Sequence, residues 1–196
     1  MGIHMYENAI DGVIPDSISD LEYLIWFNIF NDAREYEYIV NSRRNTIYKW
    51  NQNIHNLGFL EEINFLNLEM QGTLDSTFNN LSKLRVINLS RNNMTGSLPN
   101  TFNQMPNLEV VQLSDNQFDG DIPSTLAALE YLKIVELNDN GFTGTIPTFV
   151  SQHLTGLEFS SNSLSGSFPT EYFVSNSYPK LDFVNANFNN FAVPSH

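Results

Sequence analysis

Four acidic residues have the clearest potential for chemistry in this chain: Asp115, Glu136, Asp139 and Glu158. Neighbouring carboxylates can act as a general acid and base, or they can attract a positively charged ligand group. Asp115 and Asp139 are 24 positions apart and each directly precedes an Asn, so their spacing follows a sequence repeat. No nucleophile accompanies them. The pattern therefore favours attraction of a cation over catalysis, and we predict that the protein is not an enzyme.

Other catalytic and metal-binding patterns are absent from the sequence. There is no GxSxG, P-loop, GxGxxG or HExxH motif, and the four His residues are scattered. The stretch DNQFD at 115–119 is similar to a calcium loop, but Gln117 and Leu126 stand where ligands belong. The chain has no Cys, which excludes disulfides and zinc–thiolate sites. We therefore expect no metal and no cofactor.

A repeat of 24 residues organises the chain. Residues 87–99 read INLSRNNMTGSLP, and the same frame returns as VQLSDNQFDGDIP at 111–123 and VELNDNGFTGTIP at 135–147. The Asn at positions 92, 116 and 140 marks this frame, and we call it the marker Asn. A fixed period of this length predicts a solenoid in which each repeat packs on its neighbours.

Each repeat position has a physical reason. Alternating apolar residues before the marker predict a short strand, and stacked strands form one parallel sheet. The amide of the marker Asn can satisfy backbone groups left open by the turn. Gly suits a positive φ, and Pro directs the chain into a 3₁₀ or short helical turn on the opposite side. Where Leu68 replaces the marker, we expect a gap filled by water or by Asn67.

These repeats resemble the plant-type subclass of leucine-rich repeats. The motif LxLxxNxLxGxIP recurs over nearly the whole chain outside 33–50, and the match is strongest over 81–169. The resemblance implies an α/β-type solenoid with a concave parallel sheet and 3₁₀ or short helices on the convex side. It also implies binding of a protein or peptide in an extracellular or cell-surface location. Unlike typical members, the chain lacks Cys-rich caps and a signal peptide.

The frame predicts a single domain over residues 1–196 with about eight coils. The step between markers is 24 from Asn8 to Asp32, but the next marker position is Leu68. The step from Asp32 to Leu68 is longer than 24 residues. We interpret the extra residues as an insertion at 33–50, which is rich in aromatic and basic residues. Because the first repeat starts almost at Met1, we expect the N-terminal end to be incomplete.

The offset from each marker predicts which residues face the concave side. The N-terminal part of this face is aromatic, with Tyr6, Trp26 and Phe30. The remaining part is polar and then acidic, with Asn64, Asn88, Gln112, Asp115, Glu136, Asp139 and Glu158. Exposed aromatic residues are frequent anchors of binding sites, and spaced carboxylates favour a Lys or Arg group. We therefore predict a concave binding face for a protein or peptide ligand with basic character.

Charge excludes one class of partner. The formal net charge is −13, which argues against nucleic acid because phosphate binding requires Lys and Arg. The longest apolar run is too short to span a bilayer. Sequons at Asn80, Asn88 and Asn93 come partly from the Asn-rich repeat itself.

Two alternatives to peptide recognition remain open from the sequence. The first is a surface-binding or structural array that binds ice or a glycan through the polar row. The second is a fragment of a repeat assembly that self-associates through an uncapped N-terminal end.

Overall fold

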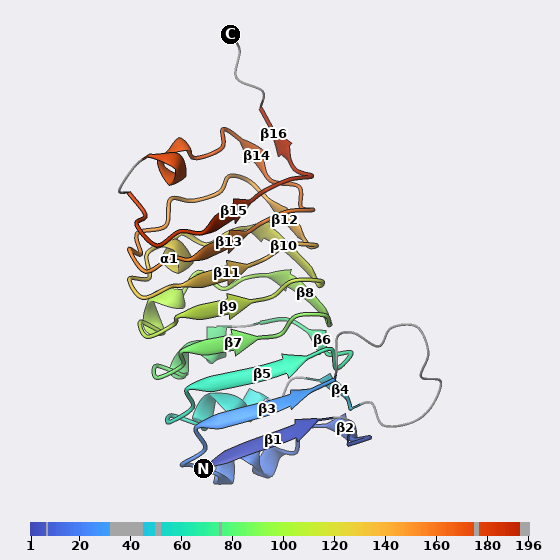
Figure 1. Cartoon of the computed structure of the whole chain (residues 1–196). Coiled ribbons are helices and arrows are strands. Elements are labelled where there is room, and N and C mark those ends of the chain that lie inside the picture. The colour runs from blue at the N-terminus through green and yellow to red at the C-terminus, as the bar shows by residue number, and fades with distance from the viewer. Residues whose placement is uncertain (7, 32–44, 50–51, 75, 175–176, 193–196) are drawn as a thin grey trace.

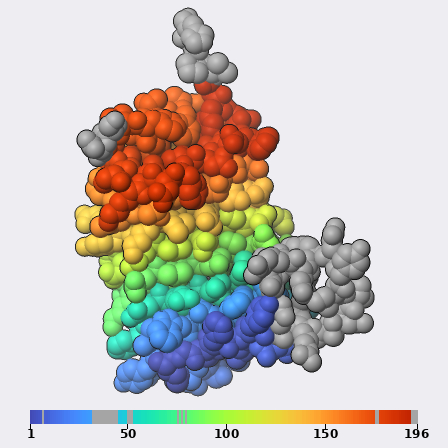
Figure 2. Space-filling model, in the orientation of Figure 1, coloured from blue at the N-terminus to red at the C-terminus, as the bar shows by residue number. Residues whose placement is uncertain are grey.

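The computed structural model describes residues 1–6, 8–31, 45–49, 52–74, 76–174 and 177–192. Repeats stack as successive layers from the N-terminus to the C-terminus (Figures 1 and 2). One parallel sheet runs along the stack, with one strand from each coil in sequence order. Its strands are β1 (Gly2–Tyr6), β3 (Trp26–Phe30), β5 (Glu62–Leu66), β7 (Val86–Asn88), β9 (Val110–Gln112), β11 (Ile134–Glu136), β13 (Gly156–Glu158) and β15 (Phe183–Asn185). The predicted concave sheet is confirmed.

Equivalent positions of the repeat are paired across this sheet. Ile87 pairs with Val111, and Val111 pairs with Val135. All three point inward, and none is more than 1% exposed. Alternate residues of a strand face opposite sides, so Asn88, Gln112 and Glu136 form a row on the outer, concave side.

A second parallel sheet was not predicted from the sequence. It contains β2 (Asp11–Val13), β4 (Thr46–Lys49), β6 (Gln71–Gly72), β8 (Asn93–Ser97), β10 (Gln117–Asp121) and β12 (Gly141–Thr143). Strands β14 (Ser165–Gly166) and β16 (Asn190–Phe191) form a further pair. At Gly120, φ is 72°, and a Cβ would lie 3.1 Å from the Cβ of Ser97 in the preceding repeat. The repeat therefore uses Gly for both backbone conformation and close stacking.

Short helical turns cover the side opposite the concave sheet (Figure 1). They are η1 (Asp16–Asp20), η2 (Gln52–Asn56), η3 (Ser76–Asn80), η4 (Phe102–Gln104), α1 (Ser124–Ala127) and η5 (Thr170–Phe173). Pro15, Pro123 and Pro169 each directly precede one of these turns, with φ between −67° and −64°. Phe102 and Leu126 from these turns are buried in the core. The predicted 3₁₀ and short-helix side is confirmed.

The marker Asn side chains form a hydrogen-bonded ladder between coils. Asn116 Nδ2 donates to the carbonyl of Leu113 in its own repeat and to that of Leu89 in the preceding one. Its Oδ1 accepts the N–H of Met94 at 3.0 Å. Since buried backbone groups need partners, this amide joins adjacent turns. Asn92, Asn140, Asn162 and Asn189 make equivalent bonds.

Asn45 is the marker of the second repeat, a role that the sequence analysis gave to Asp32. Asn45 Oδ1 accepts the N–H groups of Asn8 and Ile10, as Asn92 Oδ1 accepts those of Leu68 and Met70. Strand β4 follows directly and joins the second sheet. The predicted insertion at 33–50 therefore extends too far, since Asn45 and β4 belong to the repeat itself. Asp32 lies outside the described residues.

Leu68 leaves the expected gap in the Asn ladder, and two other groups close it. The Oδ1 of Asn31 accepts the N–H of Asn45 at 2.8 Å. The carbonyl of Leu68 accepts the N–H of Ile47 at 2.9 Å. In a regular repeat, the side-chain oxygen of the marker Asn would accept hydrogen bonds from these two N–H groups. The structure thus fills the position with Asn31 and a backbone carbonyl.

Candidate concave binding face

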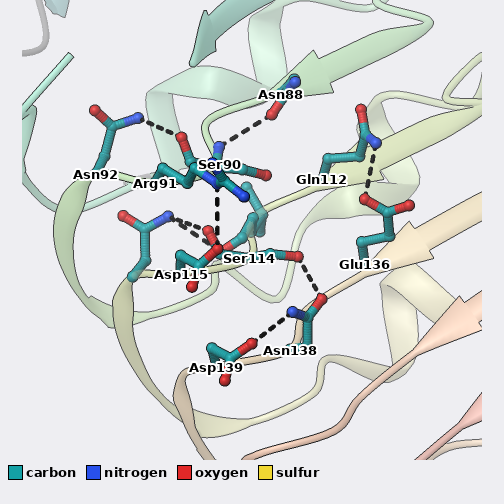
Figure 3. A network of polar contacts seen from close by, with 12 residues as sticks. Asn88, Ser90, Arg91, Asn92, Gln112, Ser114, Asp115, Glu136, Asn138 and Asp139 are labelled. Atoms are coloured by element: carbon teal, nitrogen blue, oxygen red, sulfur yellow. Dashed lines mark hydrogen bonds and ion pairs between the residues drawn. The ribbon is translucent and has the colours of Figure 1, made fainter. Parts of the chain in front are cut away.

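The acidic half of the concave face is a network of contacts between repeats (Figure 3). Gln112 Nε2 donates to Glu136 at 2.8 Å, and the Ser114 hydroxyl donates to Asn138 Oδ1 at 2.6 Å. Asn138 Nδ2 donates to Asp139 at 2.7 Å. The repeat offset predicts only that these rows are polar and acidic. The structure shows that they first hold one another in place.

Asp115 and Asp139 occupy the sharp turn at the end of the concave strands. Their φ values are 55° and 54°, in the left-handed region where Asp is tolerated better than most residues. Both side chains are exposed. Arg91 Nε lies 3.5 Å from Asp115 Oδ2, so one of the two carboxylates has an internal cation beside it. Asp139 therefore carries the less compensated charge of the pair.

Glu158 continues the row that begins with Asn88. It is paired with Glu136 across the sheet, and its Oε1 accepts the N–H of Ser160 at 3.1 Å. Asn88 uses its Oδ1 in the same way for Ser90. These side chains cap the ends of their own short strands, and the second carboxylate oxygen of Glu158 has no hydrogen bond among the described residues.

The N-terminal part of the face carries aromatic side chains. Tyr6 and Trp26 are 42% and 52% exposed, and Phe30 is half-buried. The ring centroids of Tyr6 and Phe30 are 5.2 Å apart, and His4 packs edge-on against Phe30 at the same distance. The indole of Trp26 lies over Gly2, where a Cβ would be 2.9 Å from its Cε3. Tyr6 and Phe30 therefore pack together, and Trp26 lies on the same face of β3 as Phe30.

Two amide oxygens beneath this aromatic surface have no hydrogen-bond partner. They are the Oδ1 atoms of Asn28 and Asn64, which are paired across the sheet. Asn28 is 8% exposed, and its Nδ2 donates to Glu62 Oε1 at 2.8 Å. The sequence analysis placed Asn64 on the face but did not distinguish it from Asn88.

A row of aromatic and basic side chains along the edge of the concave sheet was not predicted from the sequence. Lys83 Nζ lies 3.8 Å from the ring centroid of Phe59, and Tyr23 packs on the other side of that ring at 5.5 Å. Tyr131 stacks with His153 further along. Most of these residues stand nine positions before a marker, so the repeat offset contained the signal. A hollow of about 380 Å³ on this edge is lined by Glu61, Lys83, Arg85, Asn107, Glu109 and Tyr131.

Alternating charges hold this edge together. Glu109 contacts Lys133 at 2.7 Å and Arg85 at 2.9 Å, and Arg85 reaches Glu61 at 3.9 Å. The hydrogen bond from Lys133, assisted by Arg85, holds the pKa of the Glu109 carboxyl below its usual value. The cations of this edge are therefore largely engaged by carboxylates within the chain.

Within the described ranges, no three His, Asp or Glu side chains are grouped so as to hold a metal ion. No helix among the described residues has the length and apolar character needed to cross a membrane.

Comparison with known proteins agrees with this architecture. A family model described as Leucine rich repeat matches residues 67–118. No curated protein matches the chain. Among solved structures, the chain is similar to the ectodomain of the Arabidopsis thaliana receptor kinase GASSHO1/SCHENGEN3 in complex with CASPARIAN STRIP INTEGRITY FACTOR 2. The identity is 21% and the TM-score 0.67, covering 92% of this chain and 23% of that chain.

Two further structures show the same likeness in fold. PEPR1–AtPEP1 is 23% identical with a TM-score of 0.68, covering 97% of this chain and 32% of that chain. A plant ice-binding protein is 22% identical with a TM-score of 0.70, covering 96% of this chain and 65% of that chain. The present chain thus spans about a quarter of the length of the GASSHO1/SCHENGEN3 ectodomain and about a third of the length of the PEPR1–AtPEP1 structure.

Proposed function

We propose that this chain, a solenoid with the fold of leucine-rich repeat proteins and repeats that resemble the plant type, is a non-catalytic recognition module. Its ligand is a protein or peptide with basic groups, bound on the concave face in an extracellular or cell-surface setting. The observation that carries this proposal is the ordered concave face itself. Tyr6, Trp26 and Phe30 lie on its first two strands, and Glu136 and Glu158 lie on later strands of the same sheet.

The contacts of this face support binding more than catalysis. Gln112 orients the carboxylate of Glu136, and the N–H of Ser160 orients that of Glu158. Oriented carboxylates in a row can receive Lys or Arg side chains with little loss of conformational entropy. A net charge of −13 also draws basic ligands by long-range attraction.

Some solved structures with the same fold contain peptide ligands. GASSHO1/SCHENGEN3 is bound to CASPARIAN STRIP INTEGRITY FACTOR 2, and a plant peptide hormone receptor is bound to RGF2. Because their sequence identity to this chain is low, they show only that the fold is shared. They therefore support the proposal only in that this fold can bind a peptide.

A peptide-display selection tests the proposal. A random library of dodecapeptides is selected against the whole chain and against the variant Glu136→Gln/Glu158→Gln. We expect the wild-type chain to enrich Lys- and Arg-containing peptides and the variant to bind them at least about tenfold more weakly. The control Asp20→Asn/Glu130→Gln changes the same charge at exposed positions away from the concave strands. Equal losses of peptide binding in this control and in Glu136→Gln/Glu158→Gln would mean that net charge alone explains the effect. That result would contradict a concave binding site.

A second candidate function is binding to a regular solid surface such as ice. The second sheet supports it, because Thr73, Thr95, Ser97, Thr143 and Thr145 are exposed along its outer side. Asp119 and Asp121 interrupt these hydroxyl rows. Ice-crystal shaping by the wild-type chain, abolished by Thr95→Lys/Thr143→Lys, would establish this function. Normal crystal growth in its presence would exclude it.

Self-association through the N-terminal end remains a third proposal. Strand β1 is the first strand of the concave sheet and pairs on one side with β3. Light scattering on the wild-type chain and on Trp26→Ala/Phe30→Ala tests it. A dimer that becomes a monomer in the variant would make the aromatic end an assembly surface.

A further inference from the structure

The unpartnered oxygens of Asn28 and Asn64 distinguish the N-terminal concave surface from the rest of the face. A covered acceptor without a hydrogen bond is destabilising relative to a satisfied one. Here two such atoms occur on adjacent strands, at positions paired across the sheet. Their coincidence on the proposed binding face points to a ligand group that supplies the missing donors.

The sequence explains why these two oxygens are left over. In the later repeats the concave strands have three residues, and Asn88 Oδ1 then accepts the N–H of Ser90. Strands β3 and β5 have five residues and continue through Phe30 and Leu66, which are paired in the sheet. With the strand prolonged, this local capping bond is not made, and the amide oxygens of Asn28 and Asn64 have no partner.

The surrounding groups select for positive charge. Glu62 places a carboxylate beside Asn28, 2.8 Å from its Nδ2. Trp26 and Phe30 flank Asn28 on the same face of β3 and offer aromatic rings, which attract cations. Strands β1, β3 and β5 contain no Lys or Arg that could provide an internal counter-charge. Oxygen acceptors, a carboxylate and aromatic rings together suit a guanidinium group.

We propose that Asn28, Asn64, Glu62 and the Trp26 ring form the receiving site for an Arg side chain of the ligand. This inference rests on the proposed peptide-recognition function and names the group that is recognised. Arg fits better than Lys, because its planar guanidinium has five donors and stacks on aromatic rings. Because the two amide oxygens are covered, binding requires neighbouring side chains to shift, and we expect this to change the environment of the half-exposed Trp26 indole.

The probe is a blocked tripeptide, acetyl-Gly-Arg-Gly-amide, and its control is the same peptide with citrulline. Citrulline keeps the shape of Arg and removes its charge. The chain has two Trp residues, so the measurements use a Trp50→Phe background in which Trp26 is the only Trp, with excitation at a wavelength that Tyr does not absorb. We expect saturable change in Trp26 emission with the Arg peptide and at least about tenfold weaker binding of the citrulline peptide.

Matched variants locate the site. Glu62→Gln keeps the shape of the side chain and an acceptor for Asn28 Nδ2, so the fold is retained while the charge is lost. We expect about tenfold weaker binding of the Arg peptide in this variant and in Asn64→Leu. Glu130→Gln removes the same charge at an exposed position away from the concave strands and is expected to leave binding of the tripeptide unchanged. Equal binding of both peptides, or an unchanged affinity in Glu62→Gln, would overturn the inference.

The outcomes separate this inference from the proposed function. If library peptides bind the concave face but are insensitive to Glu62→Gln and Asn64→Leu, the Arg site is wrong and peptide recognition stands. If the tripeptide binds as expected but no library peptide depends on Glu136 and Glu158, the Arg site stands and the acidic half loses its role. Absence of binding by any basic peptide would overturn both.

Discussion

Asn31 and Asn45 exchange two hydrogen bonds across fourteen positions of sequence. The N–H of Asn45 donates to Asn31 Oδ1, and Asn31 Nδ2 donates to the carbonyl of Asn45, both at 2.8 Å. The two side chains are 2% and 1% exposed. Asn31 and Asn45 are thus joined directly by buried amide and backbone groups.

This geometry predicts that residues 32–44 can be removed. The step from Asn8 to Asn45 is 37, and subtraction of these 13 residues restores the regular 24. After deletion, Asn31 would occupy the turn position held by Asn67, whose φ is 60° and which Asn tolerates. We expect the shortened chain to keep its circular dichroism spectrum, with a midpoint of thermal unfolding equal to or above that of the wild type. Loss of cooperative unfolding would contradict this.

Asn45→Ala is expected to destabilise the protein. The substitution leaves the N–H groups of Asn8 and Ile10 without the Oδ1 that they share. Part-buried donors without partners cost about 1–3 kcal/mol, so we expect a loss of about 2 kcal/mol in the free energy of unfolding in urea. Asn103→Ala, at an exposed position of η4, is the control and should change the free energy by less than about 0.5 kcal/mol. Equal stability of both variants would refute the marker role of Asn45.

The regular repeats could be predicted because one template fixes both packing and hydrogen bonding. Period-two alternation identified Ile87, Val111 and Val135 as inward residues, and the marker Asn identified the turn. The second sheet escaped prediction because its strands are short and their pattern, as in Gln117–Asp121, contains exposed polar residues and Gly. Such segments have low strand propensity, and only stacking on neighbouring repeats makes them strands.

The candidate site was predictable in position but not in internal contacts. Repeat offsets placed Glu136 and Asn64 on the concave face. Offsets alone could not show that Gln112 engages Glu136 while Asn64 Oδ1 has no partner. That difference depends on strand length, which varies between five residues in β5 and three in β9. The marker of the second repeat was missed because counting 24 residues leads to Asp32, and the insertion displaces the true marker to Asn45.

Gly120→Ala is expected to be more harmful than an ordinary surface substitution. Its φ of 72° disfavours a side chain, and the new Cβ would crowd Ser97 at 3.1 Å. We expect a loss of about 1–3 kcal/mol in the free energy of unfolding. Gly58→Ala is the matched control, because no atom lies within 4 Å of the added Cβ and its φ is not positive. A loss as large at Gly58 would contradict the stacking explanation.

The charged edge predicts a pH dependence of stability that is specific to Glu109. Its folded-state pKa is lowered, first by the hydrogen bond from Lys133 and also by Arg85. The stabilisation is therefore fully present above the ordinary pKa of about 4.5 and is lost as pH falls through the lowered value. Urea unfolding from pH 6 to pH 3 should show the difference between wild type and Glu109→Gln shrink toward zero. We expect no more than about 1 kcal/mol, because the pair is near the surface. A difference independent of pH would contradict the ionic explanation.

Tyr172→Phe is expected to weaken the C-terminal coils through a single lost hydroxyl. This hydroxyl donates to the carbonyl of Pro147 at 2.8 Å and accepts the N–H of Phe149 at 3.3 Å. The side chain is buried, which also raises the pKa of its hydroxyl. Removing it leaves the buried N–H of Phe149 and the part-buried carbonyl of Pro147 unpaired, so we expect about 1–3 kcal/mol less stability in urea. Tyr131→Phe removes the hydroxyl of a ring that is 51% exposed and should cost far less. Faster hydrogen exchange at the Phe149 amide in Tyr172→Phe, but not in Tyr131→Phe, would locate the effect. Unchanged exchange at Phe149 would mean that the hydroxyl does not join these coils.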